Sequence, residues 1–293
     1  MESFSVVLAF ATTICDQLGE MFARTRQMWS VQPEGGTHVN TTETMRRDWD
    51  ERAKKNAFHY IASWRKDWDL NSFLASGEED YQRFVLPVLE RCKIASSGKV
   101  MVELGCGAGR MTPNFALHYE CVLALDLSIE MLERARQVHS KQKNILWLRA
   151  SGGDLACLAS DSADFVFSYL VLQHLPSEAL VFAYVREILR VLQPGGAFLF
   201  QFNGSHSPTM NLRGRIVWGM VDTLWSVKLT WLSHAVASLF GLDPAAAGKT
   251  WRGAAIVASR VGDIVQSSGG EIREMSGVNT PMTWCCGVKV ARA

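Results

Sequence analysis

The chain has 293 residues, of which 48% are hydrophobic and 20% are charged, and its formal net charge is +1. This length exceeds what one hydrophobic core usually needs, so we expect one domain of about 200 residues with additions. The near-zero net charge gives no support to nucleic-acid binding, which depends on basic surfaces. The seven cysteines lack a Cys-x-x-Cys spacing and the seven histidines lack a ligand spacing. We therefore expect reduced thiols, a cytoplasmic protein and no metal site.

The first 96 residues predict a helical cap ahead of the main domain. Residues 4–15 are apolar, but no Lys or Arg precedes them, so we expect a packed amphipathic helix rather than a signal peptide or membrane span. Residues 32–44 are rich in Gly and Thr and look like a linker. A mixed-charge helix is predicted from Met45, and a further helix is predicted over residues 79–92.

An apolar run leads directly into a glycine-rich turn, VMVELGCGAGRM. Residues 100–104 suit a strand that is buried on both faces of a parallel sheet. Gly105, Gly107 and Gly109 suit a backbone at positive φ, or one that a ligand must approach closely. A dinucleotide fingerprint would place its last glycine where this chain has Arg110, which counts against a nicotinamide cofactor. A tight strand-to-helix connection without any ligand is the alternative interpretation.

Further strands alternate with helices after this turn, which predicts a doubly wound parallel sheet. Asp126 ends the second strand, where a carboxylate can accept both ribose hydroxyls of a bound adenosine; a helix N-terminal acid is the alternative. Asp154 follows the third strand and is placed to accept from an adenine amino group, unless it only forms a surface turn. The predicted strands are residues 121–125, 145–148, 163–169 and 197–202.

Five segments resemble, in order, the motifs of class I S-adenosylmethionine-dependent methyltransferases: VELGCGAGRMT, LALDLSIEML, GGDL, ADFVFSYLVLQHLP and LQPGGAFLFQF. They cover about residues 98–203, and later segments resemble the last helix and closing strands of that family. The upstream WDERAKKNAFHYIA looks like the N-terminal helix of many bacterial small-molecule members. The resemblance implies a mostly parallel, seven-stranded, Rossmann-like sheet over residues 97–293, with S-adenosylmethionine as cofactor and S-adenosylhomocysteine as product.

The resemblance also implies roles for individual residues. Glu103 and the glycines would hold the methionine part, Asp126 the ribose, and Leu127 the adenine face, with Asp154 and Leu155 at the adenine edge. Cys106 occupies a variable position of the turn. The resulting candidate cofactor site comprises Glu103, Gly105, Cys106, Gly107, Gly109, Asp126, Leu127, Asp154, Leu155 and Tyr60.

Methyl transfer is an in-line displacement at a sulfonium carbon, so catalysis can rest largely on positioning the nucleophile. If the acceptor is a hydroxyl or phenol, His174 could act as the base, because histidine titrates near neutral pH. The alternative is a structural histidine that orders the loop or lines the pocket. Gln173 and Gln201 could orient a polar acceptor, although ordinary strand-end hydrogen bonding is equally compatible with Gln201.

Residues 205–250 predict a helical insertion that forms a lid. Its apolar side chains, with Trp218 and Trp225 among them, would favour an apolar or aromatic acceptor of natural-product type. Alternatively, these tryptophans seal the lid onto the domain or pair two subunits in a homodimer. A membrane span is disfavoured because Asp222 and Lys228 would lie near its centre.

Two other functions are compatible with the cofactor motifs. One is an enzyme that cyclises the aminobutyrate arm of S-adenosylmethionine and releases methylthioadenosine. The other is a cofactor-binding protein without catalysis. We expect a small-molecule acceptor and no nucleic-acid partner, since the chain lacks a basic patch and an Asn/Asp-Pro-Pro-aromatic motif.

Overall fold

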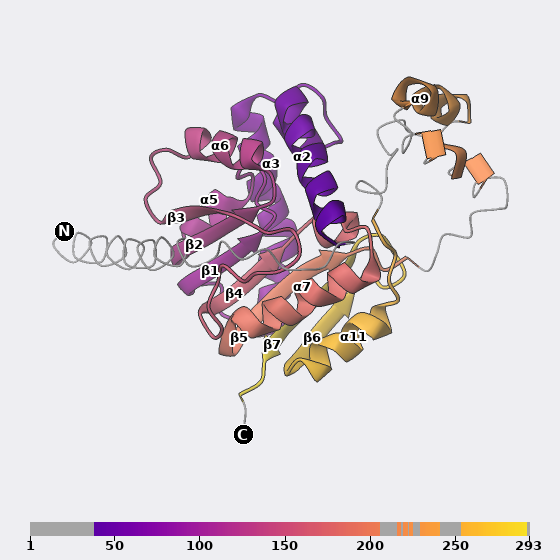
Figure 1. Cartoon of the computed structure of the whole chain (residues 1–293). Helices are drawn as coiled ribbons and strands as arrows, with labels where there is room; N and C mark the ends of the chain where they lie inside the picture. Colours follow the sequence, from indigo (N-terminus) through magenta and orange to yellow (C-terminus); the bar gives the residue numbers. More distant parts are fainter. Residues whose placement is uncertain are drawn as a thin grey trace.

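The computed structural model describes residues 38–205, 216–217, 219–221, 223–224, 229–240 and 253–291. Its centre is a seven-stranded sheet with the order β3-β2-β1-β4-β5-β7-β6 (Figure 1). The first five strands are parallel, and β7 runs antiparallel to both of its neighbours. This confirms the predicted doubly wound, mostly parallel sheet. The strands are β1 Gly98–Leu104, β2 Tyr119–Asp126, β3 Ile145–Arg149, β4 Ala163–Ser168, β5 Leu192–Phe202, β6 Gly270–Ser276 and β7 Thr283–Lys289.

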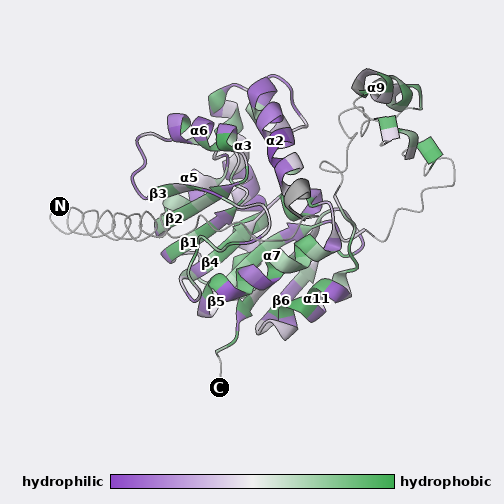
Figure 2. Ribbon diagram, viewed as in Figure 1, coloured by the Kyte–Doolittle hydropathy of each residue, from purple (hydrophilic) through white to green (hydrophobic). Residues whose placement is uncertain are grey.

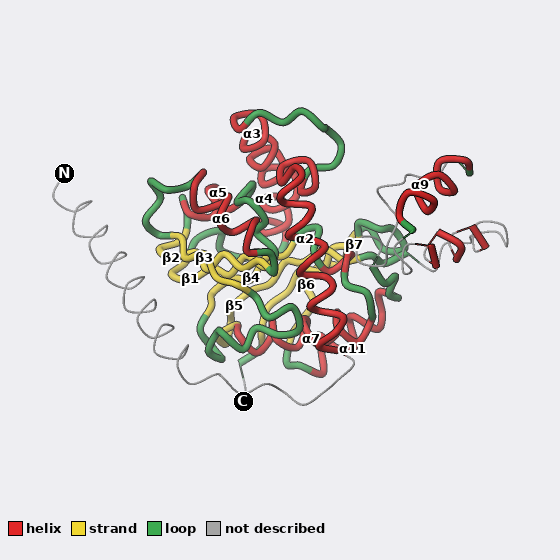
Figure 3. The backbone as a smooth tube through the Cα atoms, turned by 45° about the horizontal axis from the view of Figure 1, so that its top comes forward, coloured by secondary structure: helices red, strands yellow, loops and turns green. Residues whose placement is uncertain are grey.

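Helices cover both faces of the sheet. Successive residues of a strand point to opposite sides, so each central strand contributes side chains to the cores on both faces. In β1, Met101 joins the core beneath α4 and α5, whereas Val102 and Leu104 join the core beneath α7 and α11. Figure 3 shows these two pairs of helices on opposite sides of the strands. The central strands therefore have continuous runs of apolar residues in the sequence. The helices are α4 Leu86–Arg91, α5 Thr112–Ala116, α6 Ile129–Val138, α7 Glu178–Val191 and α11 Ala258–Ser267.

Two serine caps determine where α6 and α7 begin. The Ser128 hydroxyl accepts from the Met131 N–H, and the Ser177 hydroxyl accepts from the Leu180 N–H. Each bond satisfies one of the N–H groups that a helix leaves unpaired in its first turn. The short 3-10 helix η2, Leu172–His174, lies between β4 and α7 and brings the predicted Gln173-His174 pair to the carboxyl end of the sheet.

The N-terminal helices differ from the predicted boundaries. Helix α2 spans His38–Ile61, so the linker predicted over residues 32–44 is wrong from residue 38 onward. Composition favoured a loop there, but Met45 is buried in the core and holds this turn as helix. The helix predicted from residue 79 already begins at α3, Leu70–Asp80, capped by Asp69, which accepts from the Ser72 N–H.

Helix α3 continues into α4 through the π-helical turn η1, Tyr81–Val85. Helix α2 contains a kink at Asn56, where φ is −168° and ψ is 86°. The Asn56 side chain accepts from the His59 N–H at 3.1 Å, so it caps the last turn of α2. The proposed division into a cap of residues 1–96 and a domain of residues 97–293 stays a prediction.

The insertion contains α9, Thr230–Leu239, which lies away from the sheet and is largely apolar (Figure 2). Val217, Val221 and Ala237 form a small apolar cluster of its own. Trp218 and Trp225 lie outside the described residues, as does the helix predicted over residues 4–15. Within the described ranges, every helix is too short or too polar to cross a membrane.

Candidate functional site

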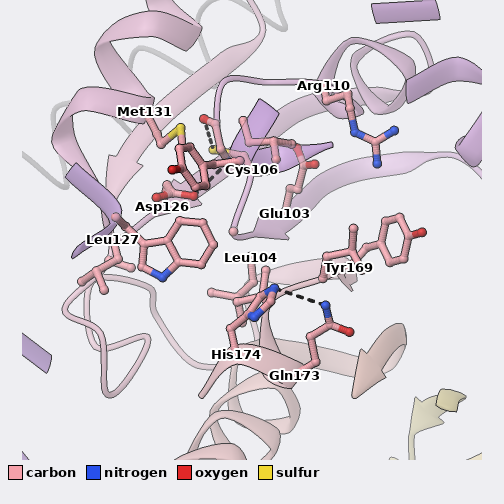
Figure 4. Close-up of a pocket in the computed structure, with 18 of the residues that line it drawn as sticks. Glu103, Leu104, Cys106, Arg110, Asp126, Leu127, Met131, Tyr169, Gln173 and His174 are labelled. Carbon is pink, nitrogen blue, oxygen red and sulfur yellow. Dashed lines mark hydrogen bonds between the residues drawn. The ribbon is translucent and has the colours of Figure 1, made fainter. Parts of the chain in front are cut away.

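A cavity of about 490 Å³ lies at the carboxyl ends of β1, β2 and β4, beneath α2. Figure 4 shows Asp126 and Leu127 at one end, Arg110 and Tyr169 at the other, and His174 opposite Glu103. The cavity collects residues that lie far apart in the chain, from Met45 to Met282. The predicted site residues that line it are Tyr60, Glu103, Gly105, Cys106, Gly107, Asp126, Leu127, Gln173 and His174.

The glycine turn has no room for a side chain at any of its three glycines, and two of them face the cavity. Gly105 has φ of 79°, and a Cβ there would lie 2.0 Å from the Val171 Cγ2 atom. Gly107 has φ of 55°, and its Cβ would lie 2.7 Å from the Ile61 Cδ1 atom of α2. The N–H groups of Gly105 and Cys106 both donate to the Leu125 carbonyl, which ties the turn to β2. The turn therefore presents bare backbone to the cavity.

Asp126 is half-buried and connects the turn to the start of α6. Its Oδ2 accepts from the Gly107 N–H at 2.9 Å, and its Oδ1 accepts from the Ser128 N–H at 2.8 Å. Burial raises the pKa of Asp126 to about 6, and the nearby Asp50 carboxylate adds to this effect. The two backbone N–H donors act in the opposite direction. The carboxylate is thus fixed in orientation beside the glycine turn.

Glu103 is the penultimate residue of β1, and only 4% of its surface is exposed. Thr112 Oγ1 donates to its Oε2 at 2.6 Å. Burial raises the pKa of Glu103 to about 7, and the Asp126 charge raises it further, whereas Thr112 and Arg110 oppose the shift. Two carboxyls with raised pKa values line one cavity, so the site favours a ligand that carries positive charge.

Glu103 makes the stability of the ligand-free protein depend on pH. Its folded pKa of about 7 exceeds the ordinary value of 4.5, so the folded protein holds this proton more tightly than the unfolded chain. The resulting stabilisation is complete below pH 4.5 and is lost as the pH rises through 7. Between pH 5 and pH 8 the unfolding free energy of the wild type should fall as Glu103 loses its proton. In Glu103→Gln this fall should be smaller by about 2 kcal/mol. Denaturant titrations check this; parallel pH curves for the two proteins would contradict it.

Four predicted site residues do not line the cavity. Asp154 is exposed, and its carboxylate accepts from the Ser151 hydroxyl at 2.8 Å and the Ala156 N–H at 3.1 Å. Leu155 is fully buried beneath α7. Asp154 bonds within its own loop here, and the adenine-edge assignment of these two residues stays a prediction. Gly109 and Gln201 lie behind the cavity wall.

Gly109 supports the turn from behind. His139 Nε2 lies 2.9 Å from the Gly109 carbonyl oxygen, and this ring nitrogen is the donor, since a carbonyl only accepts. The His139 ring stacks on Trp147 at 5.6 Å, and burial lowers its pKa. A Cβ on Gly109 would lie 2.7 Å from the His139 ring. The packing against His139 therefore requires a glycine at position 109, and a direct contact of Gly109 with the cofactor stays a prediction.

Sequence reasoning missed several residues at the acceptor end. The sequence assigns no site role to Arg110, yet it is 3% exposed and lines the cavity. Its Nη1 lies 2.8 Å from Asp80 Oδ2 and donates to the Ser76 carbonyl at 3.0 Å, which fastens α3 to the turn. Trp64 lines the cavity too. The spacing of aromatics along the N-terminal helices was the available signal for Trp64; nothing in the pattern identified Arg110.

The described part of the insertion contributes no side chain to the cavity. Closure of the insertion over this site stays a prediction. Among the residues that the structure describes, no group of three or more His, Cys, Asp or Glu side chains could hold a metal ion.

Comparison with known proteins agrees with this architecture. Residues 102–200 match the family model described as a methyltransferase domain. The magnesium protoporphyrin IX methyltransferase of Synechocystis PCC 6803, solved with bound S-adenosylhomocysteine, aligns with a TM-score of 0.54 at 17% identity, over 84% of this chain and 99% of that chain. Residues 102–200 are therefore similar to a methyltransferase domain, and the whole sheet has the fold of a solved methyltransferase. S-adenosylmethionine is the cofactor of this family.

Curated relatives match over part of their length. A malonyl-[acyl-carrier protein] O-methyltransferase of Marinomonas sp. (strain MWYL1) is 31% identical over 147 residues, which are 50% of this chain and 53% of the relative. A ubiquinone biosynthesis O-methyltransferase of Aromatoleum aromaticum is 26% identical over 161 residues, which are 54% of this chain and 58% of the relative. The chain thus spans little more than half the length of either.

Proposed function

We propose that this protein transfers the methyl group of S-adenosylmethionine to a small apolar or aromatic acceptor. One observation carries the proposal: a bare glycine turn, the buried Glu103 carboxyl, the half-buried Asp126 carboxyl and an aromatic wall meet in a single cavity. Asp126 would hold the ribose, and Leu127 would pack on the adenine. Glu103 would bind the cationic amino group of the methionine part, in keeping with its negative surroundings.

The opposite wall supports an apolar acceptor. Trp49, Trp64, Tyr169 and Met282 line the cavity, and Tyr169 lies at the end remote from Leu127 (Figure 4). The relatives named above are methyltransferases named for a malonyl carrier protein, ubiquinone biosynthesis and a porphyrin. A pocket of this kind would align the acceptor with the sulfonium, and such alignment can lower a barrier by roughly 7 to 11 kcal/mol.

Calorimetric titration with S-adenosylhomocysteine, with NAD run beside it, tests the cofactor. Micromolar binding of the former alone supports the proposal, and binding of NAD alone would contradict it. Incubation with S-adenosylmethionine and a panel of apolar acceptors then tests the reaction. S-adenosylhomocysteine as product indicates methyl transfer, whereas methylthioadenosine would indicate attack on the aminobutyrate arm.

His174→Ala should slow turnover at least several-fold with little change in cofactor affinity. The ring lies beside Trp49, with centroids 5.5 Å apart, on the acceptor side of the cavity and away from Asp126. Steady-state rates with the acceptor found by the screen, together with S-adenosylhomocysteine titrations, check this. Wild-type turnover in the variant would show that His174 takes no part in the reaction.

Location and assembly are proposals of the same kind. We infer a cytoplasmic protein that pairs as a homodimer through the insertion or the N-terminal helices, and that has no nucleic-acid partner. Light scattering of the purified protein checks the assembly, and a monomer at micromolar concentration would contradict it.

A further inference from the structure

The orientation of the Gln201 side chain is determined by two backbone groups. Gln201 is fully buried on β5. The Leu170 N–H donates to its Oε1 at 3.1 Å, and its Nε2 donates to the Pro281 carbonyl at 2.7 Å. A backbone N–H can only donate and a carbonyl can only accept, so only one of the two amide orientations satisfies both neighbours.

The orientation of the Gln201 amide determines that of the Gln173 amide. The Gln201 Nε2 also donates to the Gln173 Oε1 at 2.9 Å. Gln173 must therefore turn its own NH₂ the other way, and its Nε2 lies 3.2 Å from the Nε2 atom of His174 (Figure 4). An amide NH₂ has no lone pair to offer, so the His174 Nε2 must be the acceptor. In a neutral imidazole the proton then resides on Nδ1.

The reversed arrangement leaves buried groups unpaired. If His174 carried its proton on Nε2, Gln173 would have to present its oxygen to the ring and its NH₂ to Gln201. Gln201 would then have to flip, which would place its NH₂ against the Leu170 N–H and its oxygen against the Pro281 carbonyl. Unpaired buried polar groups of this kind are strongly disfavoured.

We infer that Gln201 and Gln173 are positioning residues that hold His174 as the neutral tautomer with its proton on Nδ1 and its Nε2 lone pair occupied. Under the proposed function, on which this consequence rests, His174 orients the acceptor and does not remove its proton through Nε2. The Gln173-His174 loop thus serves to align the acceptor. The acceptor atom that attacks the methyl group must already be nucleophilic, because His174 does not deprotonate it through Nε2. The tautomer itself is a property of the protein without ligand.

Nitrogen-15 NMR of the histidine rings in the full chain tests the inference. The spectrum distinguishes a protonated from an unprotonated ring nitrogen, and the signals lost in His174→Asn identify those of His174. We expect Nδ1 protonated and Nε2 unprotonated in the wild type. Protonation at Nε2, or an even mixture of the two tautomers, would overturn the inference.

Two substitutions at Gln173 make the test specific, because this half-buried residue lines the cavity and tolerates a change of equal size. In Gln173→Glu, a carboxylate can accept from both Gln201 and His174. The proton should then move to Nε2, and the ring should titrate about one pH unit or more higher than in the wild type. Gln173→Met removes both bonds, so the preference for one tautomer should disappear. An unchanged His174 spectrum in both variants would overturn the inference.

Cofactor binding separates this result from the proposed function. Gln173 lies on the acceptor side, so both Gln173 variants should bind S-adenosylhomocysteine within about twofold of the wild type. If the wild-type protein does not bind it at all, the proposed function fails while the tautomer result still stands on the NMR data. If binding is intact and the tautomer is wrong, only the positioning role fails.

Discussion

Asp126→Ala should weaken binding of S-adenosylhomocysteine by more than tenfold. Under the proposed function, the substitution removes hydrogen bonds between a charged acceptor and the ribose hydroxyls, each worth roughly 1.5 to 3 kcal/mol. It also releases the Gly107 and Ser128 N–H groups, which Asp126 holds at 2.9 and 2.8 Å. Both effects act in the same direction, because a loosened glycine turn is a poorer surface for the cofactor. Calorimetric titration at constant pH measures the change.

Asp154→Ala is the matched control for this prediction. Both aspartates follow a strand of the sheet and both lie in motifs of the resemblance, but Asp154 is exposed and bonds within its own loop. We expect its removal to change the affinity by less than about twofold. Unchanged affinity in a folded Asp126→Ala protein would contradict the ribose assignment. Equal losses of affinity in the two variants would show that Asp154 belongs to the cofactor site.

Gly77→Ala should destabilise the fold by about 3 kcal/mol, the upper end of what overpacking usually costs. A Cβ at this position in α3 would lie 2.0 Å from the Arg110 carbonyl oxygen and 2.7 Å from its carbonyl carbon. Neither atom is the end of a flexible side chain, so either α3 or the end of the glycine turn must move. Alanine is the better helix former by about 1 kcal/mol, but this gain is smaller than the clash.

Gly153→Ala is the control for overpacking. No atom lies within 4 Å of a Cβ built there, so the unfolding free energy should stay within about 0.5 kcal/mol of the wild type. Denaturant unfolding of both variants provides the comparison. A Gly77→Ala protein as stable as Gly153→Ala would show that α3 can move away from Arg110 without cost. In the expected case, cofactor affinity should fall too, since Arg110 directly follows the turn.

Local sequence determined the elements that carry the cofactor site. The apolar run of β1 has to be buried on both faces, and the glycines after it occupy a turn that leaves no room for a Cβ at Gly105 or Gly107. Ser128 and Ser177 cap their helices through bonds that span only three residues. Because parallel strands place their carboxyl ends at one edge, the convergence of Glu103 and Asp126 also followed from the order of elements.

Contacts between distant segments decided what the sequence left open. Asp154 has the predicted place in the chain, but its side chain bonds to residues two and three positions away and does not line the cavity. The role of Gln201 depends on Pro281, 80 positions later, and the need for glycine at position 77 depends on the Arg110 backbone. Residue patterns in the sequence indicate periodicity and local hydrogen bonds. The partners of Gln201 and Gly77 depend instead on which distant groups meet when the sheet and its helices pack. The sequence therefore determined the fold and most of the residues that line the cavity, and only the tertiary structure decided the partners of Asp154, Gln201 and Gly77.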